Sequence, residues 1–160
     1  MGVIVRIAVA DEWRAVRDIR LRALVQDPTA FGSSFAREAL FDELVWRQRV
    51  EVGHWVLAWT GEEPVGLVAG VINSESSDHE LVGMWVEPEQ RGTGVATLLV
   101  DSISTWAKRL SARSLSLWVV VENVRARRFY ERLGFRGTGD YAKLPSHPEL
   151  TEEKMSVQLR

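Results

Sequence analysis

The sequence predicts an α/β (α+β) fold with three layers, in which helices flank both faces of a mixed, mostly antiparallel central sheet. Two observations favour this class. Segments with the period of a strand alternate with segments of helical period, in the order β-α-α-β-β-β-α-β-α-β(β). Short turns between neighbouring strands require antiparallel pairing, whereas connections through a helix permit a parallel pair. No repeat or low-complexity linker divides the chain, so we expect residues 1–160 to form a single domain.

The first third of the chain is expected to form one strand and two helices. Residues 3–8 are rich in β-branched side chains, as in a strand. Asp11 can cap a helix that ends near Asp27. A second helix is expected at about residues 38–52. Its buried side is expected to carry four apolar residues, which are Leu40, Leu44, Val45 and Trp46.

The rest of the chain alternates strands with two further helices. The segment at residues 65–72 is apolar on both faces, which is typical of a central strand, and Pro88 stops the strand that follows it. In chain order, the expected elements are strands at 54–60, 65–72 and 80–86, a helix at 94–110, a strand at 115–121, a helix at 124–133 and a final strand at 155–159.

The composition is that of a soluble globular protein. Hydrophobic residues make up 46% and charged residues 26%, and the net charge of −2 disfavours nucleic acid as a partner. The chain has no cysteine, which excludes disulfides, thiolate metal sites and a cysteine nucleophile. No apolar run is long enough for a membrane helix, no signal peptide is apparent, and no histidine or acidic cluster has metal-ligand spacing. We therefore expect a cytoplasmic protein with no metal and no membrane partner.

The strongest chemical signal lies between the strand that ends near residue 86 and the long helix that follows. It is the glycine loop, Arg91-Gly92-Thr93-Gly94-Val95-Ala96. Free amides and partial positive charge at a helix N-terminus suit a phosphate, and glycines let it approach the backbone. The alternative is a glycine turn without a ligand. A dinucleotide fingerprint fits poorly because Thr97 stands where Gly or Ala is needed, and a P-loop is excluded because no Gly-Lys-Ser/Thr follows.

A second segment follows the next expected strand and reads Asn123-Val124-Arg125-Ala126-Arg127-Arg128-Phe129-Tyr130-Glu131-Arg132-Leu133-Gly134-Phe135. Together, the two segments resemble the paired signatures of the GCN5-related N-acetyltransferase (GNAT) superfamily. Arg91, Gly94 and Ala96 match its Gln/Arg-x-x-Gly-x-Gly/Ala loop. Its Asn-x-x-Ala-x-x-x-Tyr-x-x-x-Gly-Phe helix is matched at Asn123, Ala126, Tyr130, Gly134 and Phe135. The resemblance spans about residues 55–135 and implies a GNAT-like acyl-CoA N-acyltransferase fold with acetyl-CoA as cosubstrate.

The resemblance implies that main-chain groups form most of the contacts with the cofactor. It implies that the pyrophosphate of coenzyme A faces the amides of Gly92, Thr93, Gly94, Val95, Ala96 and Thr97. It places the pantetheine arm along Met84, Trp85 and Val86, where one amide could polarise the thioester carbonyl. Arg91 either adds charge or is solvated. Asn123 either bonds the arm or only caps its helix, and Ala126 is small enough for the cofactor to lie close.

Tyr130 and Glu80 are the expected catalytic residues. The departing thiolate should resemble that of cysteine, with a pKa of ~8.5 against ~10 for tyrosine, so complete proton transfer from Tyr130 is uphill by about 2 kcal/mol. Hydrogen-bond donation to the sulfur needs no complete transfer and is the expected role. Glu80 matches the glutamate that acts as base in histone-acetylating members of the superfamily. An ordinary carboxylate is a weak base, so burial or a relaying water has to help it. Asp78 and His79, beside it, either share this task or are surface turn residues.

The acceptor is expected to be a primary amine on a small molecule or a peptide. It should attack the thioester directly in a ternary complex, because no cysteine can carry an acyl intermediate. In the superfamily, segments corresponding to about residues 22–46 and 137–150 wall the acceptor pocket. They offer Phe31, Phe35, Trp46 and Tyr141 as an aromatic wall, and Glu38, Asp42 or Glu43 as a partner for an ammonium group. The alternative function is a non-catalytic acyl-CoA-binding module that regulates a partner. The resemblance also favours a homodimer.

Overall fold

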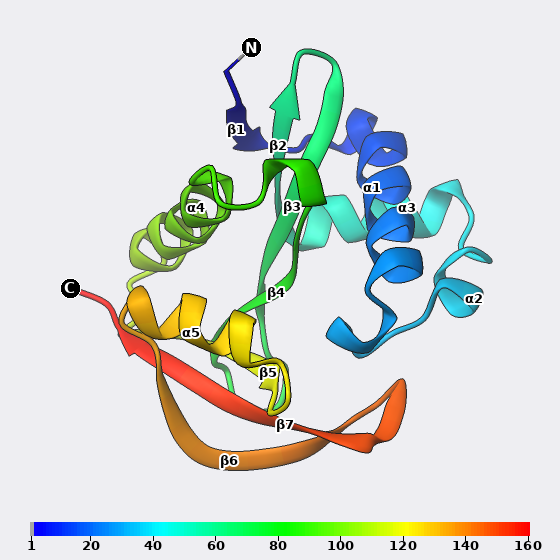
Figure 1. Cartoon of the computed structure of the whole chain (residues 1–160). Helices are drawn as coiled ribbons and strands as arrows, with labels where there is room; N and C mark the ends of the chain where they lie inside the picture. Colours follow the sequence, from blue (N-terminus) through cyan, green and yellow to red (C-terminus); the bar gives the residue numbers. More distant parts are fainter. Residues whose placement is uncertain (1) are drawn as a thin grey trace.

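Seven strands form one mixed sheet in the computed structural model, which describes residues 2–160 (Figure 1). The strands are β1 (Ile4–Ile7), β2 (His54–Thr60), β3 (Glu63–Ile72), β4 (His79–Val86), β5 (Ser114–Val120), β6 (Arg136–Leu144) and β7 (His147–Gln158). Their order across the sheet is β1-β2-β3-β4-β5-β7-β6. β4 and β5 pair in parallel, and the other neighbours pair antiparallel. The predicted mixed, mostly antiparallel sheet is confirmed.

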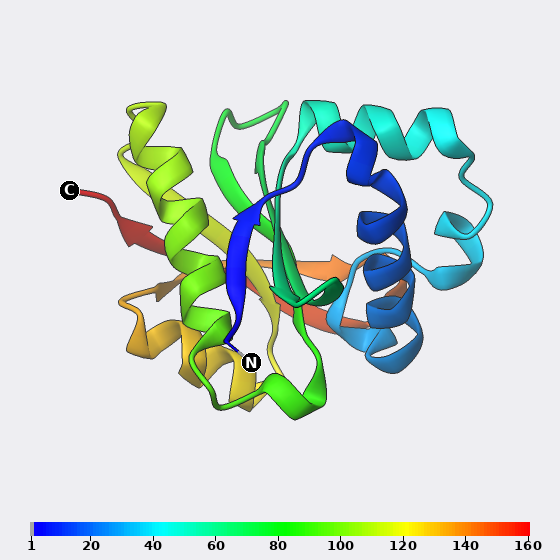
Figure 2. The same ribbon diagram turned by 90° about the horizontal axis from the view of Figure 1, so that it is seen from above.

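Helices cover both faces of the sheet and complete three layers (Figure 2). They are α1 (Trp13–Gln26), α2 (Phe35–Glu38), α3 (Glu43–Val52), α4 (Val95–Arg109) and α5 (Val124–Arg132), with 3-10 turns η1 (Ala10–Glu12), η2 (Pro28–Ala30) and η3 (Pro88–Gln90). α1 and α3 share one buried core with the sheet, and α4 and α5 share the other. Of the helices within residues 2–160, none has both the length and the hydropathy that a membrane crossing requires.

β3 lies between the two cores because successive side chains of a strand point to opposite faces. Leu67 and Ala69 are fully buried on the face of α1 and α3, whereas Val68 is fully buried on the face of α4. Burying a leucine or valine side chain contributes about 1.5–3 kcal/mol relative to leaving it exposed. The predicted central position of this strand is confirmed, and β3 provides a well-packed support for its neighbour β4.

The helix predicted at about residues 38–52 is α3, which begins only at Glu43, and a separate short helix, α2, precedes it. The carboxylate of Asp42 accepts a hydrogen bond from the amide of Val45 and starts α3 anew. Leu40 therefore falls in the connecting loop and is 85% exposed, and Leu44 is 63% exposed, so their predicted burial is wrong. Trp46 is fully buried, as predicted.

The predicted cap of α1 by Asp11 is also wrong. Asp11 lies in η1, before α1, and its carboxylate pairs with Arg47 of α3. The turn is organised instead by Glu12, whose carboxylate accepts hydrogen bonds from the amide of Val9 and the guanidinium of Arg6.

The sequence does not predict the long hairpin that β6 and β7 form at the edge of the sheet (Figure 1). Much of it falls in residues 137–150, for which a loop is expected. Every residue of β6 except Leu144 is exposed, so this strand lacks the buried alternation that marks a strand in a sequence. β7 pairs with β5 and buries Met155, which explains why only its last part is predicted.

Candidate active site

β4 diverges from its parallel neighbour β5. Within residues 2–160, a single Cα register pair, Glu80 with Ser116, joins the two strands. Beyond it, residues 81–86 of β4 have no register partner in β5. Main-chain groups on such an open edge can bind an extended ligand in the way they would bind another strand.

A bulge interrupts β4 along this open edge. Between two ladder pairs with β3, two residues of β4, Gly83 and Met84, face one residue of β3. Gly83 has a φ of +65°, a left-handed conformation that costs other residues about 1–2 kcal/mol. A bulge leaves a residue out of the ladder and redirects the strand, so main-chain groups of β4 are available at this point.

A cavity of about 530 Å³ lies between β4, the glycine loop, the first turn of α4 and α5, and is named the β4–α5 cleft. It brings together most of the residues predicted to bind the cofactor, which are Met84, Trp85, Val86, Arg91, Gly92, Gly94, Ala96, Thr97, Asn123 and Ala126. The predicted catalytic Tyr130 lines it as well. Thr93 and Val95 do not: the Thr93 hydroxyl donates to the carbonyl of Gln90, and the Val95 side chain is buried in the core.

The glycine loop has the conformation of an anion-binding turn. Gly92 and Gly94 have φ of +77° and +93°, and a Cβ added at either would meet no atom of residues 2–160 within 4 Å other than those of its chain neighbours. Gly94 is the N-cap residue of α4, and no side chain in the described chain caps this 15-residue helix. Its first amides are therefore unpaired, and the helix dipole adds partial positive charge. This arrangement suits a phosphate group.

Arg91 lines the β4–α5 cleft and is anchored to the protein, and its role toward the cofactor stays a prediction. Its Nε donates to the carbonyl of Val86 at 2.9 Å, and its Nη2 donates to the carboxylate of Asp27 at 3.1 Å. The indole of Trp85 donates to the same carboxylate oxygen of Asp27, at 2.7 Å. Asp27 thus ties the end of α1 to both β4 and the glycine loop, and no sequence signal indicated this contact.

Asn123 lies at the N-terminal end of α5, and Tyr130 lies near its C-terminal end. The side-chain oxygen of Asn123 accepts a hydrogen bond from the amide of Ala126 at 3.2 Å, so the capping role is observed. Tyr130 is 8% exposed and packs edge-on against Phe129 and Phe135. Burial raises the pKa of Tyr130 above its usual range. The phenol therefore keeps its proton and can act as a hydrogen-bond donor.

The predicted base, Glu80, lies outside the β4–α5 cleft. It precedes Met84 by four positions of β4, which is roughly 13 Å along an extended strand. Its buried carboxylate accepts a hydrogen bond from the side-chain Nδ2 of Asn73 at 3.4 Å. Burial, and then the negative charge of Glu80, raise the pKa of Glu152 on β7. Glu152 was missed because its strand segment was not predicted.

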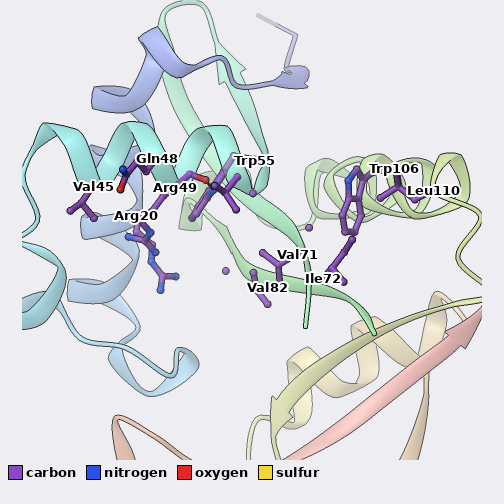
Figure 3. Close-up of a pocket in the computed structure, with 14 residues that line it drawn as sticks. Arg20, Val45, Gln48, Arg49, Trp55, Val71, Ile72, Val82, Trp106 and Leu110 are labelled. Carbon is purple, nitrogen blue, oxygen red and sulfur yellow. Dashed lines mark hydrogen bonds between the residues drawn. The ribbon is translucent and has the colours of Figure 1, made fainter. Parts of the chain in front are cut away.

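A second cavity, of about 740 Å³, lies between α3 and the C-terminal part of α4 and is named the α3–α4 cavity (Figure 3). Its lining residues are Arg20, Val45, Gln48, Arg49, Val52, Gly53, Trp55, Gly70, Val71, Ile72, Val82, Gly83, Trp106 and Leu110. β4 borders this cavity with Val82 and Gly83, and it borders the β4–α5 cleft with residues 84–86. The two cavities therefore border adjacent residues of β4, Gly83 and Met84.

The residues predicted to hold the acceptor contribute little to either cavity. Trp46 is fully buried, and Tyr141 is 60% exposed on β6. Glu38 lies buried between Arg20 and Arg49. Burial alone would raise the pKa of Glu38, but the hydrogen bonds and charge of Arg20 and the hydrogen bond of Arg49 lower it to about 2. Two arginines thus occupy this carboxylate, so it is not free to hold an ammonium group.

Within residues 2–160, no group of three or more His, Asp and Glu side chains has the arrangement to hold a metal ion.

Comparisons with known proteins agree with this architecture. The uncharacterized N-acetyltransferase MJ1207 of Methanocaldococcus jannaschii is 39% identical over 93 residues, which are 55% of this chain and 41% of that protein. The peptidyl-lysine N-acetyltransferase YjaB of Salmonella typhimurium is 31% identical over 106 residues, 66% of each chain. The chain thus spans less than half the length of the archaeal relative.

Solved structures share the fold. YncA of Salmonella typhimurium, solved with its cofactor acetyl-CoA, superposes with a TM-score of 0.79 at 17% identity and covers 100% of this chain and 95% of its own. The sequence profile of the acetyltransferase (GNAT) family matches residues 13–135. This match covers well over half of the sequence, and the chain therefore belongs to the acetyltransferase (GNAT) family.

Proposed function

We propose that the protein transfers an acetyl group from acetyl-CoA to a primary amine by direct attack in a ternary complex. The observation that carries the proposal is the β4–α5 cleft, in which an open strand edge, an uncapped helix N-terminus and a buried tyrosine converge. Family membership and the acetyl-CoA bound by the structural neighbour YncA support the cosubstrate. The name of the Salmonella relative YjaB, a peptidyl-lysine N-acetyltransferase, supports an amine acceptor.

The glycine loop and β4 fit the two ends of coenzyme A. The open space at Gly92 and Gly94 and the free amides of α4 are suited to the pyrophosphate, and the unpaired edge of β4 is suited to the amide-bearing pantetheine arm. Acetyl-CoA supplies an activated acetyl thioester there. Main-chain amides at the bulge of Gly83 and Met84 stabilise negative charge that develops on the carbonyl oxygen.

The proposed reaction requires two proton transfers. An alkylammonium near pKa 10 loses one proton before its nitrogen bonds the acetyl carbon, and Glu80 with Glu152 accepts it, through water because of their distance from the cleft. As the carbon–sulfur bond breaks, the second proton moves from nitrogen to sulfur. Tyr130, which keeps its own proton, donates a hydrogen bond to the departing sulfur. A homodimer and a cytoplasmic location stay predictions of the sequence.

Calorimetric titration with coenzyme A, followed by a thiol-release screen with acetyl-CoA and a panel of amines, tests the proposal. We expect binding in the micromolar range that is typical of enzyme substrates and thiol release with at least one amine. Binding without thiol release from any amine would instead favour the non-catalytic acyl-CoA-binding module. Absence of binding to both coenzyme A and its acetyl ester contradicts both functions.

A further inference from the structure

Two arginines that line the α3–α4 cavity, the buried Arg20 and the partly buried Arg49, form a cluster with one buried carboxylate, Glu38. Arg20 donates to Glu38 through Nε and Nη2, at 3.1 and 2.9 Å. Arg49 donates to the same carboxylate through Nη1 at 2.8 Å. Glu38 is ionised at neutral pH, so two positive charges face one negative charge and the cluster carries a net charge of about +1.

The cluster has unused hydrogen-bond donors. Arg20 is 8% exposed, and its Nη1 donates no hydrogen bond to any of residues 2–160. Nε and Nη2 of Arg49 also have no acceptor in this part of the chain. Both arginines line the cavity, as Figure 3 shows. Hydrogen bonds between guanidinium and an anion are among the stronger ones in proteins, so these donors favour an anionic ligand group.

The arginines are oriented before any ligand arrives. The guanidinium of Arg20 lies 5.0 Å from the ring centroid of Phe31. That of Arg49 lies 4.7 Å from the ring of Trp46 and 5.5 Å from that of Trp55. Stacking on aromatic rings fixes the donor directions and reduces the entropy that ligand binding would otherwise cost.

The free Nη1 of Arg20 lies beside the bulge of β4. It is 3.4 Å from the position that a Cβ would take on Gly83. Gly83 lines the α3–α4 cavity, and the next residue, Met84, lines the β4–α5 cleft. A carboxylate bound to Arg20 therefore sits close to Gly83, one residue from the β4–α5 cleft, and an amine on the adjacent carbon of the same molecule can lie against the bulge.

The remaining lining is mostly apolar. It includes Trp55, Val71, Val82 and Trp106, which Figure 3 shows along the cavity. Within residues 2–160 no aspartate or glutamate lines it. A second ammonium group, as in a polyamine, would meet positive charge and no carboxylate here, whereas an apolar side chain would be removed from water.

We propose that the α3–α4 cavity is the acceptor site and that the acceptor is an α-amino acid with an apolar side chain. Its carboxylate binds Arg20 and Arg49, its side chain lies toward Trp55 and Trp106, and its amine faces the bulge of β4. This inference rests on the proposed acetyl transfer and specifies its substrate class.

Three compounds of nearly equal shape test the role of the carboxylate. They are L-leucine, L-leucinamide, in which the carboxylate is a neutral amide, and 3-methylbutylamine, which lacks it. We expect kcat/KM in thiol release to be at least tenfold higher for leucine than for either analogue. Calorimetric titration without acetyl-CoA provides a second readout, and we expect heat of binding from leucine alone.

The variant Arg49→Gln tests the charge of the cluster. It leaves Arg20 paired with Glu38 and lowers the net charge to about zero. We expect the KM for leucine to rise at least tenfold, kcat to change less than twofold, and the preference over leucinamide to disappear. The matched control is Arg47→Gln on the same helix, because Arg47 pairs with Asp11 and Glu43 away from the cavity. This control should keep the wild-type KM and preference, and thermal unfolding of both variants checks that they fold.

The outcomes separate the two proposals. If leucinamide or 3-methylbutylamine serves as well as leucine, or if Arg49→Gln keeps the preference, the amino-acid assignment is overturned while acetyl transfer stands. If no amine gives thiol release although coenzyme A binds, acetyl transfer fails. In that case, leucine titration still decides whether the cavity binds the amino acid, and absence of heat overturns the inference as well.

Discussion

The β4–α5 cleft and the α3–α4 cavity border the same strand but are built from different parts of the chain. The cleft offers mainly main-chain groups: the open edge of β4, the glycine loop and the first turn of α4. The cavity offers side chains from helices, above all Arg20 and Arg49 with Glu38 between them. A site of main-chain groups is fixed by the fold, whereas a site of side chains can change its ligand without changing the fold.

The largest effect is expected from Glu38→Gln, which dismantles the side-chain site. The pKa of Glu38 falls from 4.5 to about 2 on folding, a difference worth about 3 kcal/mol in stability. Because the folded-state pKa is the lower one, this stability is present above about pH 4.5 and is lost as pH falls toward 2. We expect the variant to lose about this amount at pH 7 and to lack the corresponding part of the acid dependence.

Urea unfolding at pH 7 and pH 3 measures both the loss of stability at pH 7 and the acid dependence of stability. The affinity for coenzyme A should stay within a factor of about three, because the main-chain site does not involve Glu38. A loss of stability below 1 kcal/mol at pH 7 contradicts the proposed strength of the cluster.

The next largest effect is expected from Tyr130→Phe. Removal of a donor to developing negative charge typically lowers kcat by about 10²-fold or more. The affinity for coenzyme A should change little, because the phenol contributes to the transition state rather than to binding. Single-turnover thiol release measures the effect on the chemical step, and calorimetric titration measures the effect on coenzyme A binding. Unchanged turnover at saturating substrate would exclude the donor role.

Gly94→Ala tests the main-chain site by placing one methyl group in the open space before the glycine loop. We expect affinity for coenzyme A to fall about tenfold, since the phosphate can no longer approach the backbone closely. Gly139→Ala is the matched control, because Gly139 also has a positive φ, +83°, and open space around its Cβ position within the described chain. Equal affinities in the two variants would show that the glycine loop does not hold the pyrophosphate.

The smallest effect is expected from Asp27→Asn. This change weakens the contacts that tie α1 to Arg91 and Trp85 but leaves the glycines intact. We expect the dissociation constant of coenzyme A to rise a few-fold and kcat to stay the same, as measured by titration and steady-state kinetics. A loss of kcat greater than the loss of affinity would place Asp27 in the chemistry instead.

Local signals explain which features the sequence predicted. Gly92 and Gly94 mark a backbone conformation that other residues rarely adopt, and Asn123 caps a helix through a residue three positions away. Both are properties of short segments, so the glycine loop and α5 were predicted together with the central strands. The roles of these residues in cofactor binding remain predictions.

Tertiary contacts explain what the sequence did not predict. Arg20 and Glu38 are 18 residues apart, so nothing in either segment indicates that the carboxylate is already occupied. Glu152 was missed because the hairpin of β6 and β7 is largely exposed and has little hydrophobic alternation. The fold was therefore more predictable than the acceptor site, which depends on contacts between distant segments.

We infer that two separate sites border β4 and are occupied at the same time. Calorimetric titration of L-leucine into protein saturated with coenzyme A tests it most directly. We predict one binding event per chain, with an affinity within about threefold of that for the free protein. Loss of leucine binding in the presence of coenzyme A would mean that the two ligands compete for one site and would contradict the claim.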